Sequence, residues 1–223
     1  MTTPQQPSYQ QRVGYQAMLL GGFSTLATAL LVVGNLATKE AIVERQREDL
    51  QQSLSQVIPA DHYDNNLLQN PLRLHDAQDR PVTVYRGTQG MQVSAMAWEI
   101  GAQGYAGKIR LILGLDATGE ILGVRVLSHA ETPGLGDRIE VEKDDWILGF
   151  NGLSLGDPPA EQWQVKKDGG RFDQFSGATI TPRGVVLAIK QGLNFYQTHQ
   201  TELLNPPVIN TQTVARENQA YAP

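Results

Sequence analysis

The sequence predicts an α+β protein in which one N-terminal membrane-spanning helix is followed by a single domain built on an antiparallel or mixed sheet with flanking helices. Three observations lead to this prediction. Residues 13–38 carry no charged side chain, residues 107–128 alternate in hydropathy around a turn, and residues 185–196 have the apolar spacing of a helix. A chain of 223 residues has room for one ordinary domain and an accessory segment.

The apolar run at 13–38 reads VGYQAMLLGGFSTLATALLVVGNLAT. At about 1.5 Å per residue it would form a helix of about 39 Å, which exceeds the ~30 Å hydrocarbon core of a bilayer. A signal peptide would have a shorter apolar core and an A-x-A-like cleavage site, whereas here Asn35 takes the −3 position before Ala37. We therefore predict an uncleaved anchor over 13–38, after a short N-terminal segment, 1–12. Basic residues lie on both sides, so charge does not decide its orientation.

The anchor is predicted to continue as a juxtamembrane helix over 39–58, which Pro59 ends. Its apolar side chains fall on one stripe, opposite charged residues: Val43, Leu50, Leu54 and Val57. Such a stripe suits a helix that packs on its own domain as well as a stalk that faces a partner, and both alternatives stay open.

The main domain is predicted over 59–199. Residues 61–80 are polar and rich in turn formers, and a strand follows at 81–85. Residues 107–128, GKIRLILGLDATGEILGVRVLS, predict a β-hairpin that turns at 116–119. Its inward side chains are expected to alternate along both strands: Ile109, Leu111, Leu113 and Leu115, then Leu122, Val124 and Val126.

The end of the chain is predicted to be mainly helical and then irregular. Residues 146–150, WILGF, indicate a short apolar helix or core segment, and residues 185–196 indicate a longer helix. The residues after His199 are polar and lack periodicity, so 200–223 are expected to form a flexible tail.

Composition excludes several kinds of chemistry. The chain has no cysteine, which rules out disulfides, thiolate catalysis and cysteine-held iron–sulfur or structural zinc sites. Its four histidines are far apart, so spacing predicts no metal site. A net charge of −5 gives no electrostatic footprint for nucleic acid.

The most informative run is DGGRFDQFSGATITPR at 168–183. Thr181 is a good helix N-cap and Pro182 suits the first helical position, so a helix should begin here and direct its free N–H groups at the preceding turn. Because Gly177 lets a backbone approach closely, this helix start could hold a phosphate, with the hydroxyl of Thr179 beside it. A simple capping turn is the alternative, since the run matches neither a Walker A loop nor a nucleophile elbow.

A second run, SHAETPGLGD at 128–137, directly follows the hairpin. Its two glycines predict an irregular loop at a strand end, where small ligands often bind. Glu131 could accept a hydrogen bond from the N–H of a heterocycle. An ordinary turn with a solvated carboxylate is the alternative.

Together, ETPGLGD at 131–137, WILGFNG at 146–152 and the run at 168–183 resemble one family in order and spacing. It is the FMN-binding domain of the G subunit of Rnf-type ion-translocating electron transport complexes. The C subunit of the sodium-translocating NADH:quinone reductase is related and shares this plan. The resemblance covers roughly the anchor through His199, and residues 173–179 match the family's D-x-x-[ST]-G-A-T flavinylation motif in full.

The resemblance implies that FMN is joined covalently, through a phosphoester, to Thr179 by a separate flavin transferase that uses FAD. Four residues would form the transferase recognition motif and the phosphate environment: Asp173, Ser176, Gly177 and Ala178. The loop near the flavin ring would comprise Glu131, Thr132, Leu135 and Gly136. Lys166 is a further candidate for a phosphate or ring contact. No catalytic residue of the subunit's own is expected, because the flavin supplies the redox chemistry.

The resemblance also implies a location and a role. The anchor would lie in a bacterial inner membrane, with its N-terminus cytoplasmic and the main domain periplasmic. The chain would relay electrons among the membrane and peripheral subunits of the complex, and would not be a complete enzyme alone. A C-type subunit of the sodium-translocating reductase, and a non-redox anchored domain for assembly or signalling, are the alternatives. A soluble exported FMN carrier would need cleavage after Ala37.

Overall fold

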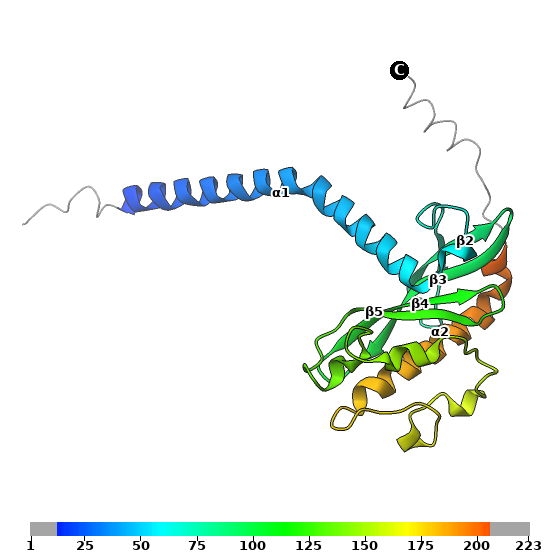
Figure 1. The fold of residues 1–223 in the computed structure, drawn as a ribbon. Coiled ribbons are helices and arrows are strands. Elements are labelled where there is room, and N and C mark those ends of the chain that lie inside the picture. Colours follow the sequence, from blue (N-terminus) through cyan, green and yellow to red (C-terminus); the bar gives the residue numbers. More distant parts are fainter. Residues whose placement is uncertain (1–12, 206–223) are drawn as a thin grey trace, which may run out of the picture. The chain divides into compact units, whose positions relative to one another are not determined.

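The computed structural model describes residues 13–205, which divide into two compact units between Asp49 and Leu50 (Figure 1). The predicted N-terminal segment 1–12 and residues 206–223 of the predicted tail lie outside the described residues. The first helix, α1 (Val13–Val57), is continuous over 45 residues and contributes to both units.

The first part of α1 has the properties of a membrane span. The segment Val13–Lys39 has a mean hydropathy of 1.9, and none of its apolar window is buried inside the protein. Its threonine hydroxyls donate to carbonyl oxygens one turn earlier, as lipid would require of polar groups. The pairs are Thr25 with Gly21 at 2.8 Å, Thr28 with Ser24 at 2.8 Å and Thr38 with Gly34 at 2.9 Å. By length and composition, this segment fits the predicted anchor.

The second unit is built on a five-stranded sheet whose strands are antiparallel and adjacent in chain order. The strands are β1 (Leu72–His75), β2 (Pro81–Gln89), β3 (Gln92–Gln103), β4 (Lys108–Asp116) and β5 (Ile121–Ser128). With helices flanking it, this sheet confirms the predicted α+β fold, and its strands are antiparallel rather than mixed.

The predicted hairpin is formed by β4 and β5. On β4 the four expected side chains are fully buried on one face: Ile109, Leu111, Leu113 and Leu115. On β5 the expected pattern is wrong at one position. The pairing shifts between Gly114 and Leu115, so β5 contains an extra residue, and Leu122 packs in the cluster on the opposite face from Val124.

The second helix, α2 (Ile180–Leu204), covers one face of the sheet (Figure 1). Its buried side chains, Val185, Ile189 and Leu193, join Trp98 and Leu113 in the larger core cluster. This helix is longer than the predicted 185–196 and continues past His199, which has non-helical backbone angles. Residues 200–204, predicted as the start of a flexible tail, are therefore helical, and Leu203 in this last turn is fully buried.

The end of α1 packs on the other face of the sheet, in a smaller cluster. Leu54 and Val57 are fully buried there against Ala95, Ala97 and Ile112. The stripe on the juxtamembrane helix therefore packs on its own domain where it lies in the second unit. Val43, in the first unit, is about half exposed, at 48 %.

This contact depends on glycine. A Cβ added at Gly114 would lie 2.3 Å from the carbonyl oxygen of Val57, so only a residue without a side chain fits beneath the helix end. Gly123, its cross-strand partner on β5, also faces Val57. The pair forms a notch into which the last turn of α1 fits.

Candidate functional site

The motif predicted to carry chemistry forms a turn that leads directly into α2. The N–H of Ala178 donates to the carbonyl of Phe175 over 3.1 Å, and Gly177 at the turn's third position has a φ of +82°. Ser176 and Gly177 are exposed at the tip. Thr179 then occupies the N-cap position, and its carbonyl accepts from the N–H of Arg183.

Thr181 was predicted as the N-cap, but the N-cap is Thr179, about half a helical turn earlier. Thr181 lies inside the first turn of α2, is fully buried, and donates its hydroxyl to the carboxylate of Glu131. The hydroxyl therefore satisfies a buried carboxylate instead of capping the helix. The true N-cap, Thr179, does not use its side chain for capping.

The start of α2 thus presents free hydrogen-bonding groups at and next to Thr179. Within residues 13–205, neither the hydroxyl of Thr179 nor the N–H groups of Ile180 and Thr181 have a hydrogen-bond partner, and Pro182 has no N–H. Unpaired N–H groups at a helix N-terminus, together with the helix dipole, favour a bound anion. These groups fit a phosphate linked at Thr179.

A loop that precedes the motif is fastened to this helix start. Lys166 forms an ion pair with Asp173 at 2.6 Å, and both side chains are more than half exposed. Arg183, in the first turn of α2, donates to both oxygens of Asp168. This hydrogen-bonded contact lowers the pKa of Asp168 below its usual value and raises the pKa of Arg183.

Aromatic rings support the motif from the core side. Phe172 stacks on Phe150 with ring centroids 4.6 Å apart, and Phe175 meets the edge of Trp146 at 5.2 Å. The indole N–H of Trp146 also donates to the carbonyl of Asp173 over 2.9 Å. The apolar segment predicted at 146–150 is the 3₁₀-helix η4 (Asp145–Phe150), and its rings hold the motif's backbone in place.

The second predicted run, 128–137, contains the loop at 131–137, which lies against the motif. A Cβ at Gly177 would be 3.6 Å from Leu135, which is 43 % exposed. The carbonyl of Thr132 accepts from the N–H groups of Leu135 and Gly136, and this turn brings Leu135 to the surface. The structure therefore brings Leu135 and Gly136 beside the start of α2, while the side chain of Thr132 is exposed.

Glu131 is buried, so the alternative of a turn with a solvated carboxylate is wrong. The side chain is buried at 5 % exposure, and its oxygens accept from the N–H of Ala106 at 2.9 Å and from the hydroxyl of Thr181. These partners come from the β3–β4 turn and from α2. The sequence did not predict either contact, because each joins segments far apart in the chain.

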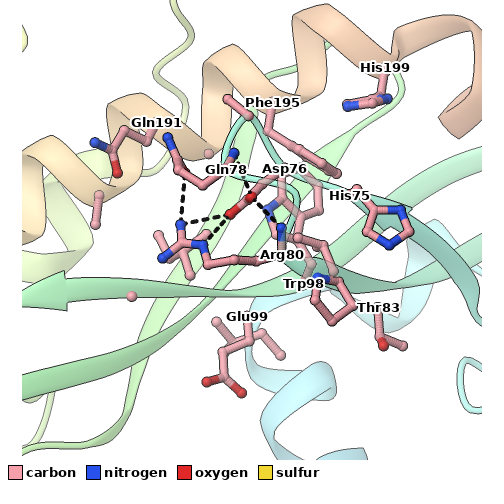
Figure 2. Close-up of a pocket in the computed structure, with 18 of the residues that line it drawn as sticks. His75, Asp76, Gln78, Arg80, Thr83, Trp98, Glu99, Gln191, Phe195 and His199 are labelled. Atoms are coloured by element: carbon pink, nitrogen blue, oxygen red, sulfur yellow. Dashed lines mark hydrogen bonds and ion pairs between the residues drawn. The ribbon is translucent and has the colours of Figure 1, made fainter.

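A cavity lies elsewhere in the second unit. About 900 Å³ in volume, it sits between the β1–β2 turn and α2, and Figure 2 shows His75, Arg80, Trp98, Phe195 and His199 around it. Asp76 and Arg80 close the turn at its rim with an ion pair of 2.6 Å. None of the predicted site residues lines this cavity. Within 13–205, no group of three histidine or acidic side chains is arranged to hold a metal.

Comparison with known proteins first gives the class. Residues 104–194 match the family model of the FMN-binding domain. The matched range includes the 131–137 loop and the whole 168–183 run, and it ends within α2. The fold and the site therefore define an FMN-binding-domain protein.

Relatives give the particular family. The chain is 50 % identical over 189 residues to the G subunit of the ion-translocating oxidoreductase complex of Cereibacter sphaeroides, covering 85 % of this chain and 86 % of that one. It is 46 % identical over 198 residues to the G subunit of the Stutzerimonas stutzeri complex, covering 89 % and 87 %. The chain belongs to the family of G subunits of ion-translocating oxidoreductase complexes, as the motifs predicted.

Solved structures of C subunits are more distant. The chain is 23 % identical to NqrC of Shewanella oneidensis, with a TM-score of 0.45 over 63 % of this chain and 74 % of that one. It is 17 % identical to the C subunit of the Na⁺-translocating NADH-quinone reductase of Parabacteroides distasonis, with a TM-score of 0.49 over 71 % and 96 %. Of the two flavoprotein alternatives, family membership supports the G subunit.

Proposed function

We propose that this chain relays electrons in an ion-translocating oxidoreductase complex through FMN held covalently on Thr179. Membership of the G-subunit family and the FMN-binding domain support the role of a flavoprotein electron carrier. The observation that supports the attachment point is the Thr179 hydroxyl, which has no partner among the described residues and stands at a helix start with two free N–H groups.

The residues around Thr179 would hold the phosphate. The N–H groups of Ile180 and Thr181, with the positive end of the helix dipole, would stabilise its negative charge. Gly177 presents an open backbone beside Ser176 and Ala178, because nothing but Leu135 lies within 4 Å of a Cβ built there.

The residues that would lie near the ring come from the neighbouring loop. Leu135 offers an exposed apolar side chain next to Gly177, and Thr132 and Gly136 form the turn that presents it. Lys166 and Asp173 lie exposed as an ion pair beside the motif. We propose that a flavin transferase recognises Asp173 and that Lys166 is available to a phosphate once it leaves this pair.

FMN supplies one- and two-electron redox chemistry, and the chain has no cysteine from which to form a thiol-based redox centre. Attachment would replace the hydroxyl proton of Thr179 with an oxygen–phosphorus bond, at the expense of the pyrophosphate bond of FAD, and AMP would leave. Because this link is covalent, the domain needs no nucleotide-binding fold to retain its cofactor. The chain's own residues then position the group, and electrons enter and leave through other subunits of the complex.

We further propose that α1 anchors the chain in the inner membrane, with the N-terminus in the cytoplasm and the main domain in the periplasm. The apolar span at Val13–Lys39 supports the anchor, and the resemblance to the family supports the orientation. In this location the flavin transferase would act on the domain after its export.

The test is the intact mass of the full chain produced with a flavin transferase in the same host. The wild type should gain the mass of FMN less one water, and Thr179→Ala should gain nothing. Thr118→Ala is the matched control, because Thr118 is an exposed threonine in the β4–β5 turn, away from the motif. A mass gain that survives Thr179→Ala would overturn the proposed attachment site.

A further inference from the structure

Glu131 is a buried carboxylate whose partners all lie inside the protein. One oxygen accepts from the N–H of Ala106 over 2.9 Å, and the other accepts from the hydroxyl of Thr181, which is itself fully buried. A buried charge needs such partners, because each lost hydrogen bond leaves it desolvated and uncompensated. Glu131 therefore ties the β3–β4 turn to the first turn of α2.

The backbone around this carboxylate leaves it no room to move. A Cβ at Gly104 would lie 2.3 Å from one oxygen of Glu131, and a Cβ at Gly136 would lie 2.7 Å from the other. Two glycines from different loops therefore close around the carboxylate. Gly184, one turn further along α2, approaches the carbonyl of Gln103 so closely that a Cβ would lie 2.2 Å from it.

His129 fixes the same residue from the backbone side. Its Nδ1 accepts from the N–H of Glu131 over 3.0 Å, so this nitrogen carries no proton, and its Nε2 donates to Glu140. Lys143 bridges Glu140 and Asp137 at 3.2 Å and 2.8 Å. Glu131 is thus held by its side chain and by its main chain, and the loop that follows it is braced by a network of ion pairs.

We propose that Glu131 is a positioning residue for flavin attachment. Through Thr181 it holds the first turn of α2, and so orients the Thr179 hydroxyl and the two free N–H groups at the helix start. This inference rests on the proposed function, and it gives Glu131 a different task from the ring contact expected from the sequence. Both of its oxygens already face protein donors.

The experiment measures how fast FMN is attached to full-length apo chain in detergent by a purified flavin transferase supplied with FAD. Three variants are compared with the wild type. Thr181→Val removes the hydroxyl at nearly constant volume, Thr181→Ser retains it, and Thr118→Val is the matched control. Thr118 also donates its hydroxyl to a carboxylate, that of Asp116 at 2.7 Å, but it lies in the β4–β5 turn.

Thr181→Val should slow attachment about tenfold, because a hydrogen bond to a buried charge is lost. The loss should fall on kcat, with KM for the apo chain unchanged, since the surface that the transferase meets is intact. Thr181→Ser should recover the wild-type rate within about twofold, and Thr118→Val should equal the wild type. A general loss of stability would not produce this combination.

Glu131→Gln keeps the size of the side chain and removes its charge, so it tests the same contact if Thr181→Val does not fold. It should also slow attachment, because an amide is a weaker hydrogen-bond partner for the Thr181 hydroxyl and the Ala106 N–H than a carboxylate is. The double variant should be no slower than the slower single variant, because both changes act on one contact. A folded Thr181→Val or Glu131→Gln variant that attaches FMN at the wild-type rate would overturn the inference. Failure of the wild type to gain FMN at Thr179 would instead reject the proposed function.

Discussion

The guanidinium of Arg183 donates to both oxygens of Asp168, with Nε 2.6 Å from one and Nη2 2.9 Å from the other. Arg183 lies in the first turn of α2, and Asp168 ends the short 3₁₀-helix η6 (Lys166–Asp168), upstream of the 173–179 motif. Because a planar guanidinium donates two parallel hydrogen bonds to one carboxylate, such a pair fixes both the distance between the two side chains and their relative orientation. The pair therefore closes the loop at 166–173 onto the helix that carries Thr179.

We predict that Arg183→Lys opens this loop while the fold is retained, because lysine keeps the charge and loses the fork. The amides of Gly169 and Gly170, which donate to Lys166 and Val165, should exchange hydrogen faster in the variant. Arg110→Lys is the control, since Arg110 forms an equally short bidentate pair with Glu99 on the sheet. Unchanged exchange at both glycines in Arg183→Lys would contradict the role given to this pair.

Gly177→Ala should destabilise the protein by about 1–2 kcal/mol, because a side chain at positive φ is strained even where space is available. It should also lower the fraction of chains that carry FMN, since the turn beside Thr179 must change shape. Gly90→Ala has the same kind of strain, with a φ of +62° and nothing within 4 Å, in the β2–β3 turn. Thermal unfolding and intact mass of both variants make the comparison. Equal FMN content in the two variants would show that the turn at Gly177 has no part in FMN attachment.

The contact with His129 should make stability depend on Glu140 at acid pH. The hydrogen bond from His129, followed by that from Lys143, lowers the pKa of Glu140 below its usual value of 4.5. A carboxyl whose folded pKa is lowered stabilises the fold above its unfolded pKa, and this stabilisation is lost as pH falls through the folded pKa.

Glu140→Gln should therefore lower the Tm near pH 7, and the difference from the wild type should disappear as the pH falls below the folded pKa of Glu140. Glu142→Gln provides the control, because Glu142 is exposed and forms no ion pair with any residue from 13 to 205. A Tm difference for Glu140→Gln that persists undiminished in acid would refute the linkage.

Gly114→Ala should destabilise the second unit by about 1–3 kcal/mol, the usual range for overpacking, since its Cβ would press on the backbone of Val57. Gly101→Ala on the neighbouring strand β3 is the matched control, because nothing lies within 4 Å of its Cβ. Chemical denaturation of the two variants measures the difference. Equal midpoints would show that α1 does not depend on the notch.

Much of the fold could be predicted wherever one face of an element is buried and the other is exposed. Strand β4 shows this alternation, and its four inward residues were predicted correctly. Strand β3 was missed, because Ala95 and Ala97 face one cluster while Met96 and Trp98 face the other, so no alternation is visible. Strand β1 lies in a polar segment and is recognisable only from its pairing with β2.

The motif could be found from sequence because its residues are consecutive, and their turn and helix start are local structures. The contacts that organise it are not local. The bond from Thr181 to Glu131 joins residues fifty positions apart, and this tertiary demand overrode the capping preference from which Thr181 was predicted as N-cap. The bulge that redirects Leu122 likewise reflects pairing between strands, which hydropathy along one strand does not record.

Helix α2 is fastened at both extremities. Glu131 and Asp168 secure its beginning, while at its far end Leu203 is fully buried and Arg86 donates to the carbonyl of Asn205 over 2.7 Å. If FMN is attached at Thr179, as proposed, its attachment point would be a helix held at both ends. Movement of that point between an electron donor and an acceptor would then require movement of the whole domain or of the partner subunits.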